Sequence, residues 1–174
     1  MRIAISGKSG CGNTTVSTLV AEKLNFKLIN FTFRNLAKEK NIEFWQFCKM
    51  AENDDSIDRE LDDRQVRMAL AEENCVLGSR LAIWKLKTAD LKVYLYASAN
   101  ERASRVFTRE GGDYNKRLEE TQMRDENDTN RYKRIYSLDN DNYNFADLII
   151  NTENKKPEDI ATLIIEKVSE TVSR

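Results

Sequence analysis

The chain has 174 residues, of which 40% are hydrophobic and 33% are charged, and its formal net charge is -1. This composition predicts one globular domain and argues against a basic protein that binds nucleic acid or a membrane surface through its charge. The chain lacks histidine, which excludes Ser-His-Asp triads and His-containing metal sites. Its three cysteines have no CxxC spacing, and neither a signal peptide nor a membrane span is evident. We therefore expect a cytoplasmic protein.

The first half of the chain alternates between strand and helix patterns. Residues 2–6 are predicted to form a buried strand, a glycine-rich turn follows, and residues 14–24 have the period of a helix. Residues 27–30 favour a second strand, and residues 33–51 favour one or two short helices. The segment from Ser56 opens with an N-cap candidate and acidic residues, which predicts a long helix.

The second half continues this alternation. Strands are predicted at residues 75–78, 91–97 and 147–152, and helices from about residue 100, at 114–138 and from Pro157. Gly111 and Gly112 separate the first two of these helices. Short apolar strands alternating with helices predict an α/β fold around a parallel sheet. Ligands of such sheets bind at the carboxyl ends of the strands.

The strongest local motif is the turn between the first strand and the first helix, GKSGCGNTT at residues 7–15. Gly7, Gly12 and Thr14 match the frame G-x-x-x-x-G-K-[ST] of a phosphate-binding loop, or P-loop. In such a loop, backbone N–H groups and a helix N-terminus bind phosphate oxygens, and the Ser or Thr hydroxyl binds Mg²⁺. The alternative is that these glycines form only a tight turn after a strand.

The motif departs from the frame at its lysine, because that position is Asn13. An asparagine donates a hydrogen bond to phosphate but brings no charge. Lys8 lies earlier in the same loop, and we expect it to fold back and act as a catalytic cation.

Arginines gather in the segment after the fourth predicted strand, at Arg102, Arg105, Arg109, Arg117, Arg124, Arg131 and Arg134. The first three share one helix face, and the set at 117, 124 and 131 forms a second stripe. A break at Gly111 and Gly112 would let the two helices face each other as a lid that binds phosphates bidentately. Interleaved acidic residues leave the alternative of solvated helices with internal ion pairs.

Further polar side chains are placed for a second phosphorylated substrate. Arg34 and Arg80 follow the second and third predicted strands, so both would lie in the same crevice as the P-loop. Asp58 and Asp62 share a helix face near Arg64 and could bind a base edge. The alternatives are surface decoration for Arg34 and a favourable helix-terminus charge for Asp58.

Together these segments resemble the cytidylate kinases of the short, archaeal type. The resemblance runs from residue 1 to about 165 and is carried by GKSGCGNTT (7–15), IDRELDDRQ (57–65), GSRLA (78–82) and RDENDTNRYKRIY (124–136). It implies a P-loop three-layer α/β fold with a central, mostly five-stranded parallel sheet. The single domain would comprise a core (1–31, 73–105, 140–174), a helical monophosphate-binding region (about 32–72) and a helical lid (about 106–139).

The resemblance also implies in-line transfer of a phosphoryl group from ATP to CMP or dCMP with Mg²⁺. By position, the resemblance implies that the ATP phosphates are bound by the P-loop residues Gly7, Lys8, Ser9, Gly10, Cys11, Gly12, Asn13, Thr14 and Thr15, and that Thr14 also binds Mg²⁺. It implies that the CMP phosphate is bound by Arg34 and Arg80, and that the monophosphate region contains Asp58, Asp62 and Arg64. The lid or the transfer site would contain Arg105, Arg109, Arg124 and Arg131. We expect a monomer with no nucleic-acid or membrane partner.

Other functions fit the same motif. One is a kinase of another nucleoside monophosphate or of a small alcohol. Another is a divergent P-loop ATPase that dimerises as a switch, with Lys8 as its signature lysine. An RNA-binding module is disfavoured by the near-neutral charge and by the lack of an aromatic and basic surface motif.

Overall fold

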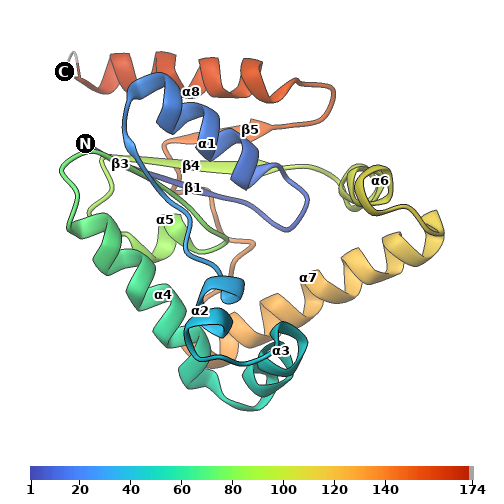
Figure 1. Ribbon diagram of the computed structural model, residues 1–174. Coiled ribbons are helices and arrows are strands. Elements are labelled where there is room, and N and C mark those ends of the chain that lie inside the picture. The colour runs from blue at the N-terminus through green and yellow to red at the C-terminus, as the bar shows by residue number, and fades with distance from the viewer. Residues whose placement is uncertain (173–174) are drawn as a thin grey trace.

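A five-stranded parallel sheet lies at the centre of the protein (Figure 1). In this computed structural model, which describes residues 1–172 apart from the side chain of Trp45, the strand order is β2-β3-β1-β4-β5. The strands are β1 (Arg2–Ser6), β2 (Lys27–Ile29), β3 (Cys75–Gly78), β4 (Leu91–Tyr96) and β5 (Leu148–Asn151). Every neighbouring pair is parallel, so the carboxyl ends of β1, β3 and β4 lie side by side.

Helices cover both faces of the sheet, which explains why the strands are mainly apolar. On one face, α1 (Asn13–Leu24) and α8 (Pro157–Val172) pack on β1, β4 and β5 (Figure 1). On the other face, α5 (Ala82–Lys85) and the end of α4 (Asp55–Leu70) pack on β1 and β3. Ile3 and Ile5 of β1 are fully buried between these layers. The predicted parallel α/β fold is confirmed.

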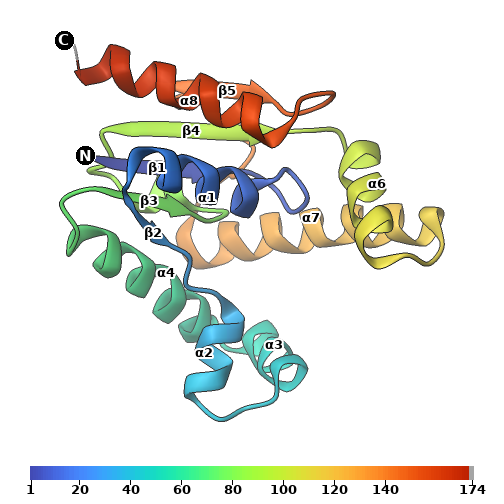
Figure 2. The same ribbon diagram turned by 45° about the horizontal axis from the view of Figure 1, so that its top comes forward.

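A separate helical group projects from the sheet (Figure 2). It consists of α2 (Phe33–Glu39), α3 (Phe44–Asn53) and the start of α4, and it has its own core around Phe47 and Leu36. The predicted helical region at 33–51 is thus two helices. The next helix starts at Asp55 because Asp54, and not the predicted Ser56, is the N-cap: the Asp54 side chain accepts a hydrogen bond from Ser56 N at 2.9 Å.

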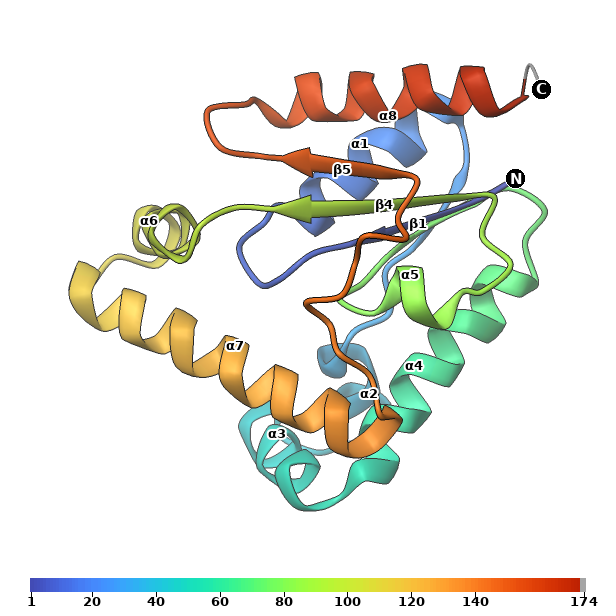
Figure 3. The ribbon, with the colours of Figure 1, turned by 180° about the vertical axis from the view of Figure 1, so that it is seen from behind.

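The helices α6 (Ala99–Glu110) and α7 (Tyr114–Tyr136) form a hairpin beside the sheet. Gly111 and Gly112 join them with φ values of 70° and 97°, a conformation that favours glycine. Figure 3 shows that α7 then spans the molecule from α6 to α4. One helix therefore contacts both the loop end of the sheet and the α2–α4 group. Within the described residues, we find no helix whose length and apolar character would let it cross a membrane.

Candidate active site

The loop between β1 and α1 has the backbone of an anion site. Gly10 and Gly12 have φ values of 86° and 95°, and a Cβ at Gly10 would lie only 2.9 Å from Cβ of Arg102. Gly12 caps α1 without a side-chain hydrogen bond to the helix. The first N–H groups of α1 therefore remain oriented for an anion at the carboxyl end of β1.

Asn13 turns into this loop. Its Nδ2 donates to the carbonyl oxygen of Gly7 at 2.6 Å, and among residues 1–172 its buried Oδ1 finds no hydrogen-bond partner. The amide at the lysine position of the frame thus bridges the loop's own backbone. Within the loop, the positive charge is that of Lys8, whose Nζ lies 2.6 Å from Oδ1 of Asp141.

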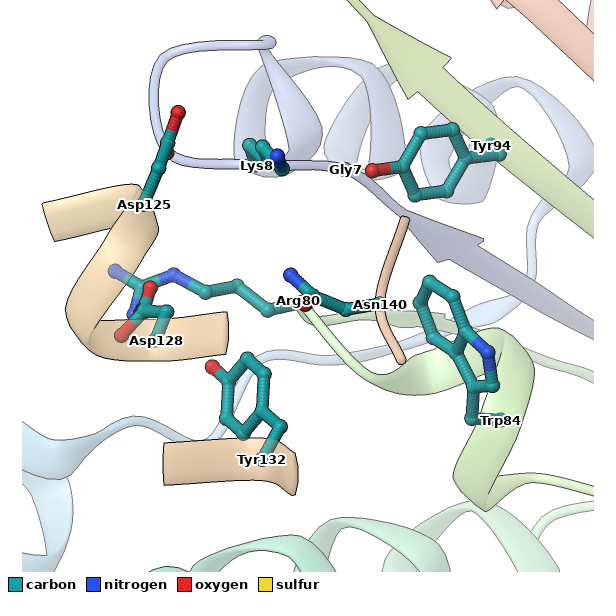
Figure 4. Close-up of a pocket in the computed structure, with 9 residues that line it drawn as sticks. All are labelled: Gly7, Lys8, Arg80, Trp84, Tyr94, Asp125, Asp128, Tyr132 and Asn140. Atoms are coloured by element: carbon teal, nitrogen blue, oxygen red, sulfur yellow. Dashed lines mark ion pairs between the residues drawn. The ribbon is translucent and has the colours of Figure 1, made fainter. Parts of the chain in front are cut away.

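A pocket opens beside the loop (Figure 4). Its walls come from the loop, from the segment after β3, from β4, from α7 and from the segment after α7. The lining residues are Gly7, Lys8, Arg80, Trp84, Tyr94, Asp125, Asp128, Tyr132 and Asn140. Figure 4 shows Arg80 extending from its loop toward Asp128, with Lys8 on the opposite side.

Alternating charges form the wall of this pocket and continue behind it. Arg80 Nη1 lies 2.7 Å from Asp128 Oδ2, and Arg131 Nη2 donates to Asp128 Oδ1 at 3.1 Å. Arg131 Nε lies 3.2 Å from Asp58 Oδ1. This series of ion pairs joins the loop after β3 to α7 and α4. Each buried charged group in it is paired with a group of opposite charge, as buried polar groups require.

Asp58 is the innermost carboxyl of the series, with 3% of the residue exposed. Burial raises its pKa to about 6, Arg131 opposes that rise, and the neighbouring carboxylate of Asp62 adds to it. Its Oδ2 accepts no hydrogen bond from the described part of the chain. Asp58 is therefore poised to change protonation or to accept a hydrogen bond near neutral pH.

Arg124 lies one helical turn from Asp128 and is exposed. It forms neither an ion pair nor a hydrogen bond with any residue between 1 and 172, and the nearby charge of Arg80 lowers its pKa. With Arg80 and Arg131 it makes three guanidinium groups against the two carboxylates of Asp58 and Asp128. The uncompensated charge of Arg124 beside Arg80 favours an anion at this end of the pocket.

Two arginines of α6 support the loop. Arg102 donates to the carbonyl oxygen of Ser9 at 3.1 Å and to Asp125 at 2.9 Å, and it is 3% exposed. Arg105 donates to the carbonyl oxygen of Gly10 at 3.2 Å and to Thr152 Oγ1 at 3.0 Å. These contacts hold the tip of the loop against α6 and the end of β5.

The other predicted site residues lie away from the pocket lining. Arg34 stacks on Phe44 at 3.9 Å, Arg64 pairs with Glu39, and Arg109 is exposed beside Glu110. Asp62 accepts a hydrogen bond from Tyr136 Oη at 2.6 Å, and burial raises its pKa. Of the predicted residues, Lys8 and Arg80 line the pocket, and Asp58, Arg124 and Arg131 lie near its charged wall. The roles predicted for all of these residues, and for Arg34, Asp62, Arg64, Arg105 and Arg109, stay predictions.

Sequence reasoning selected Asp58 but not Asp125, Asp128 or Asp141, whose carboxylates pair with Arg102, Arg80 and Lys8. Asp125 and Asp128 lie in the segment RDENDTNRYKRIY, and their i, i+3 spacing places them on one helix face. That spacing is a signal that was available. Asp141 lies in an irregular segment, and only the folded chain brings it to Lys8.

The sheet, the glycine-rich loop after its central strand and the arginine-bearing helices define the class of P-loop kinases. The fold is similar to that of shikimate kinase from Acinetobacter baumannii, with a TM-score of 0.64, 20% identity and coverage of 97% of this chain and 93% of that chain. The profile of the cytidylate kinase-like family matches residues 2–154, and the chain belongs to this family.

Two relatives extend the match over nearly the whole chain. Cytidylate kinase 2 of Borreliella burgdorferi is 46% identical over 172 residues, which cover 97% of this chain and 95% of that protein. Cytidylate kinase of Archaeoglobus fulgidus is 42% identical over 170 residues, covering 97% and 94%. The resemblance to the archaeal type is therefore confirmed, and membership of this kinase family implies ATP as the co-substrate.

Proposed function

We propose that this protein transfers the γ-phosphoryl group of ATP to CMP, and also to dCMP. The observation that carries the proposal is the pocket between the P-loop and the arginine series of α7 and Arg80, in a chain that matches proteins named cytidylate kinase at up to 46% identity. In this proposal the donor binds on the P-loop side of the pocket and the acceptor on the side of Arg80 and α7.

The donor side is the loop at residues 7–15. Its backbone N–H groups and Lys8 bind the phosphates of ATP. Thr14 is an exposed residue, and its hydroxyl group with phosphate oxygens and water would make a set of hard oxygen ligands that suits Mg²⁺. Among residues 1–172 no group of three or more Asp, Glu, Cys or His could hold a metal, which fits an ion bound chiefly through its nucleotide. When bound, Mg²⁺ neutralises charge on the phosphates.

The acceptor side lies across the pocket. We assign the acceptor phosphate to Arg80 and Arg124. Arg80 lines the pocket, and the neighbouring Arg124 forms no ion pair or hydrogen bond within residues 1–172, which leaves its guanidinium group available. Asp58, Asp128 and Arg131 present acceptors and donors for the nucleoside, and a carboxylate that accepts from an exocyclic amine favours cytosine over uracil. Arg34 and the α6–α7 lid remain part of this proposal.

Chemically, the reaction requires positioning and charge stabilisation. An oxygen of the acceptor phosphate attacks the γ-phosphorus, a new P–O bond forms, and the bond to the β-phosphate oxygen breaks in line as ADP leaves. The acceptor phosphate is largely ionised at neutral pH because its second pKa is about 6, so no general base is needed. Lys8 and the converging arginines stabilise the charge on the transferred group.

The test is ADP release from Mg·ATP with CMP, dCMP, UMP, AMP or GMP as acceptor, against a blank without acceptor. We expect strong release with CMP and dCMP. Release with another acceptor would reassign the substrate, and release equal to the blank in every reaction would contradict the kinase. The ATPase switch would instead show slow hydrolysis without acceptor and ATP-dependent dimers in sedimentation, whereas we propose a monomer in the cytoplasm.

A further inference from the structure

Four ion pairs within residues 1–172 contribute carboxylates or cations to the pocket, and they differ in exposure. The side chains of Arg131 and Asp128 are 20% and 10% exposed. The side chains of Arg102 and Asp125 are 4% and 18% exposed, and those of Arg80 and Asp128 are 29% and 10% exposed. The Lys8–Asp141 pair is different, because its side chains are 25% and 55% exposed. Exposed pairs are weak, so the Lys8–Asp141 contact is the one that a competing anion breaks most easily.

The position of Lys8 gives such a competitor. Lys8 is the cation of the loop itself, and Asn13 has turned inward to Gly7. Within residues 1–172, the ammonium group of Lys8 forms an ion pair with one carboxylate, that of Asp141. A triphosphate on the loop would offer several negative oxygens at the same place, and charge-assisted hydrogen bonds to phosphate are the stronger contacts.

Asp141 is held in a defined place. Its backbone N–H donates to Asp139 Oδ1 at 3.0 Å, which is a local turn in the segment between α7 and β5. Lys8 therefore forms an ion pair with a carboxylate of the segment between α7 and β5, and this pair connects the P-loop to that segment.

We propose that Asp141 stores the Lys8 cation in the nucleotide-free enzyme and releases it when ATP binds. Lys8 exchanges the Asp141 carboxylate for phosphate oxygens, and no covalent bond changes. The exchange keeps a lone ammonium group from repelling Arg80 and Arg124 in the empty pocket. It also frees the segment after α7 from the P-loop upon nucleotide binding. This inference rests on the proposed role of the loop as the ATP site, and it is independent of the acceptor.

The experiment is a double-mutant cycle on ATP affinity in the full chain. The variants are Lys8→Gln, Asp141→Asn and the double variant, and the dissociation constant of the Mg²⁺ complex of a non-hydrolysable ATP analogue is measured by calorimetry without acceptor. Lys8→Gln should weaken binding by at least about tenfold, because it removes charge-assisted hydrogen bonds. Asp141→Asn should strengthen binding, since ATP no longer competes for Lys8.

The decisive quantity is the difference between the two backgrounds. Removing the Asp141 carboxylate also reduces electrostatic repulsion of the ATP phosphates, so binding should improve somewhat even without Lys8. The gain from Asp141→Asn should therefore be larger with Lys8 than with Gln at position 8, by about two- to fivefold, the range of an exposed ion pair. Asp63→Asn is the matched control, because the Asp63 side chain is 59% exposed and, within residues 1–172, its one ion pair is with Lys85, at 3.6 Å. It should leave affinity unchanged.

Three results would overturn the inference. Unchanged affinity in Lys8→Gln would mean that Lys8 does not reach the phosphates. Equal gains in both backgrounds would mean that Asp141 acts only through its field. Weaker binding in Asp141→Asn would mean that Asp141 positions Lys8 and does not compete with ATP. Asp141→Ala repeats the comparison, thermal unfolding confirms that each variant folds, and failure of CMP as acceptor would leave the cycle unaffected.

Discussion

Arg131 Nε of α7 lies 3.2 Å from Asp58 Oδ1 of α4, in a contact that is almost entirely buried on the aspartate side. A second pair, Arg134 Nη2 with Asp55 Oδ1 at 2.6 Å, and the hydrogen bond from Tyr136 to Asp62 join the same two helices. The helix that carries the pocket arginines is thereby attached to the helical group that we assign to the monophosphate. Closure over one substrate is expected to move both.

The buried carboxyl of Asp58 should make stability depend on pH. Its folded pKa of about 6 lies above the ordinary value of 3.8, so the folded state binds the proton more tightly than the unfolded state. Proton binding by Asp58 therefore contributes about 3 kcal/mol to the free energy of unfolding below about pH 4, and this contribution is lost as the pH rises to about 6. Urea unfolding of wild type and Asp58→Asn at several pH values should show the variant gaining over wild type across this window. Parallel curves would contradict the assignment.

Arg124 should matter for turnover and not for stability. Since it has no ion pair within residues 1–172 and lies near Arg80, Arg124→Gln should leave the melting temperature unchanged or slightly raised. If it binds the acceptor or transferred phosphate, kcat should fall about 100-fold, as for loss of one oxyanion donor. Arg67→Gln, at an exposed position of α4, is the control. Losses below about tenfold for every one of Arg105, Arg109, Arg124 and Arg131 would defeat the lid assignment.

A lysine at position 13 should replace Lys8. In the background Lys8→Gln, the further change Asn13→Lys restores a cation in the usual place of the P-loop frame. We expect ATP affinity to recover by at least about tenfold, the value of a charge-assisted contact. The change also removes the hydrogen bond from Asn13 to Gly7, so thermal unfolding is measured alongside. No recovery in a folded double variant would show that the loop needs Asn13 as its internal bridge.

Arg102 should act through the loop that it supports. Replacing it by alanine leaves Asp125 and the carbonyl of Ser9 without a buried donor, which should destabilise the protein by about 3 kcal/mol or more. The comparison is Arg109→Ala, because the side chain of Arg109 is 69% exposed and should cost less than about 0.5 kcal/mol. Chemical unfolding measures both. A similar small loss in the two variants would mean that the buried pair does not stabilise the loop.

The fold could be predicted largely from local patterns. All five strands were expected close to their observed bounds, because each is a short apolar run between turn residues. The four-residue helix α5 was missed, since one turn has no measurable period. The start of α4 was placed at the wrong cap because both Asp54 and Ser56 are good N-cap residues, and the backbone of the preceding turn selects between them.

The candidate site shows a sharper division. The sequence by itself determined the residue types that phosphate chemistry requires: the glycines of residues 7–15, Lys8 and the arginines after residue 101. Only the tertiary structure decided which arginines face the pocket and which support the loop. Lys8 and Asp141 are far apart in the sequence, and they meet at 2.6 Å because the segment between α7 and β5 passes beside the loop that follows β1. Ion pairs depend on distance in space, and local sequence patterns carry no information about it.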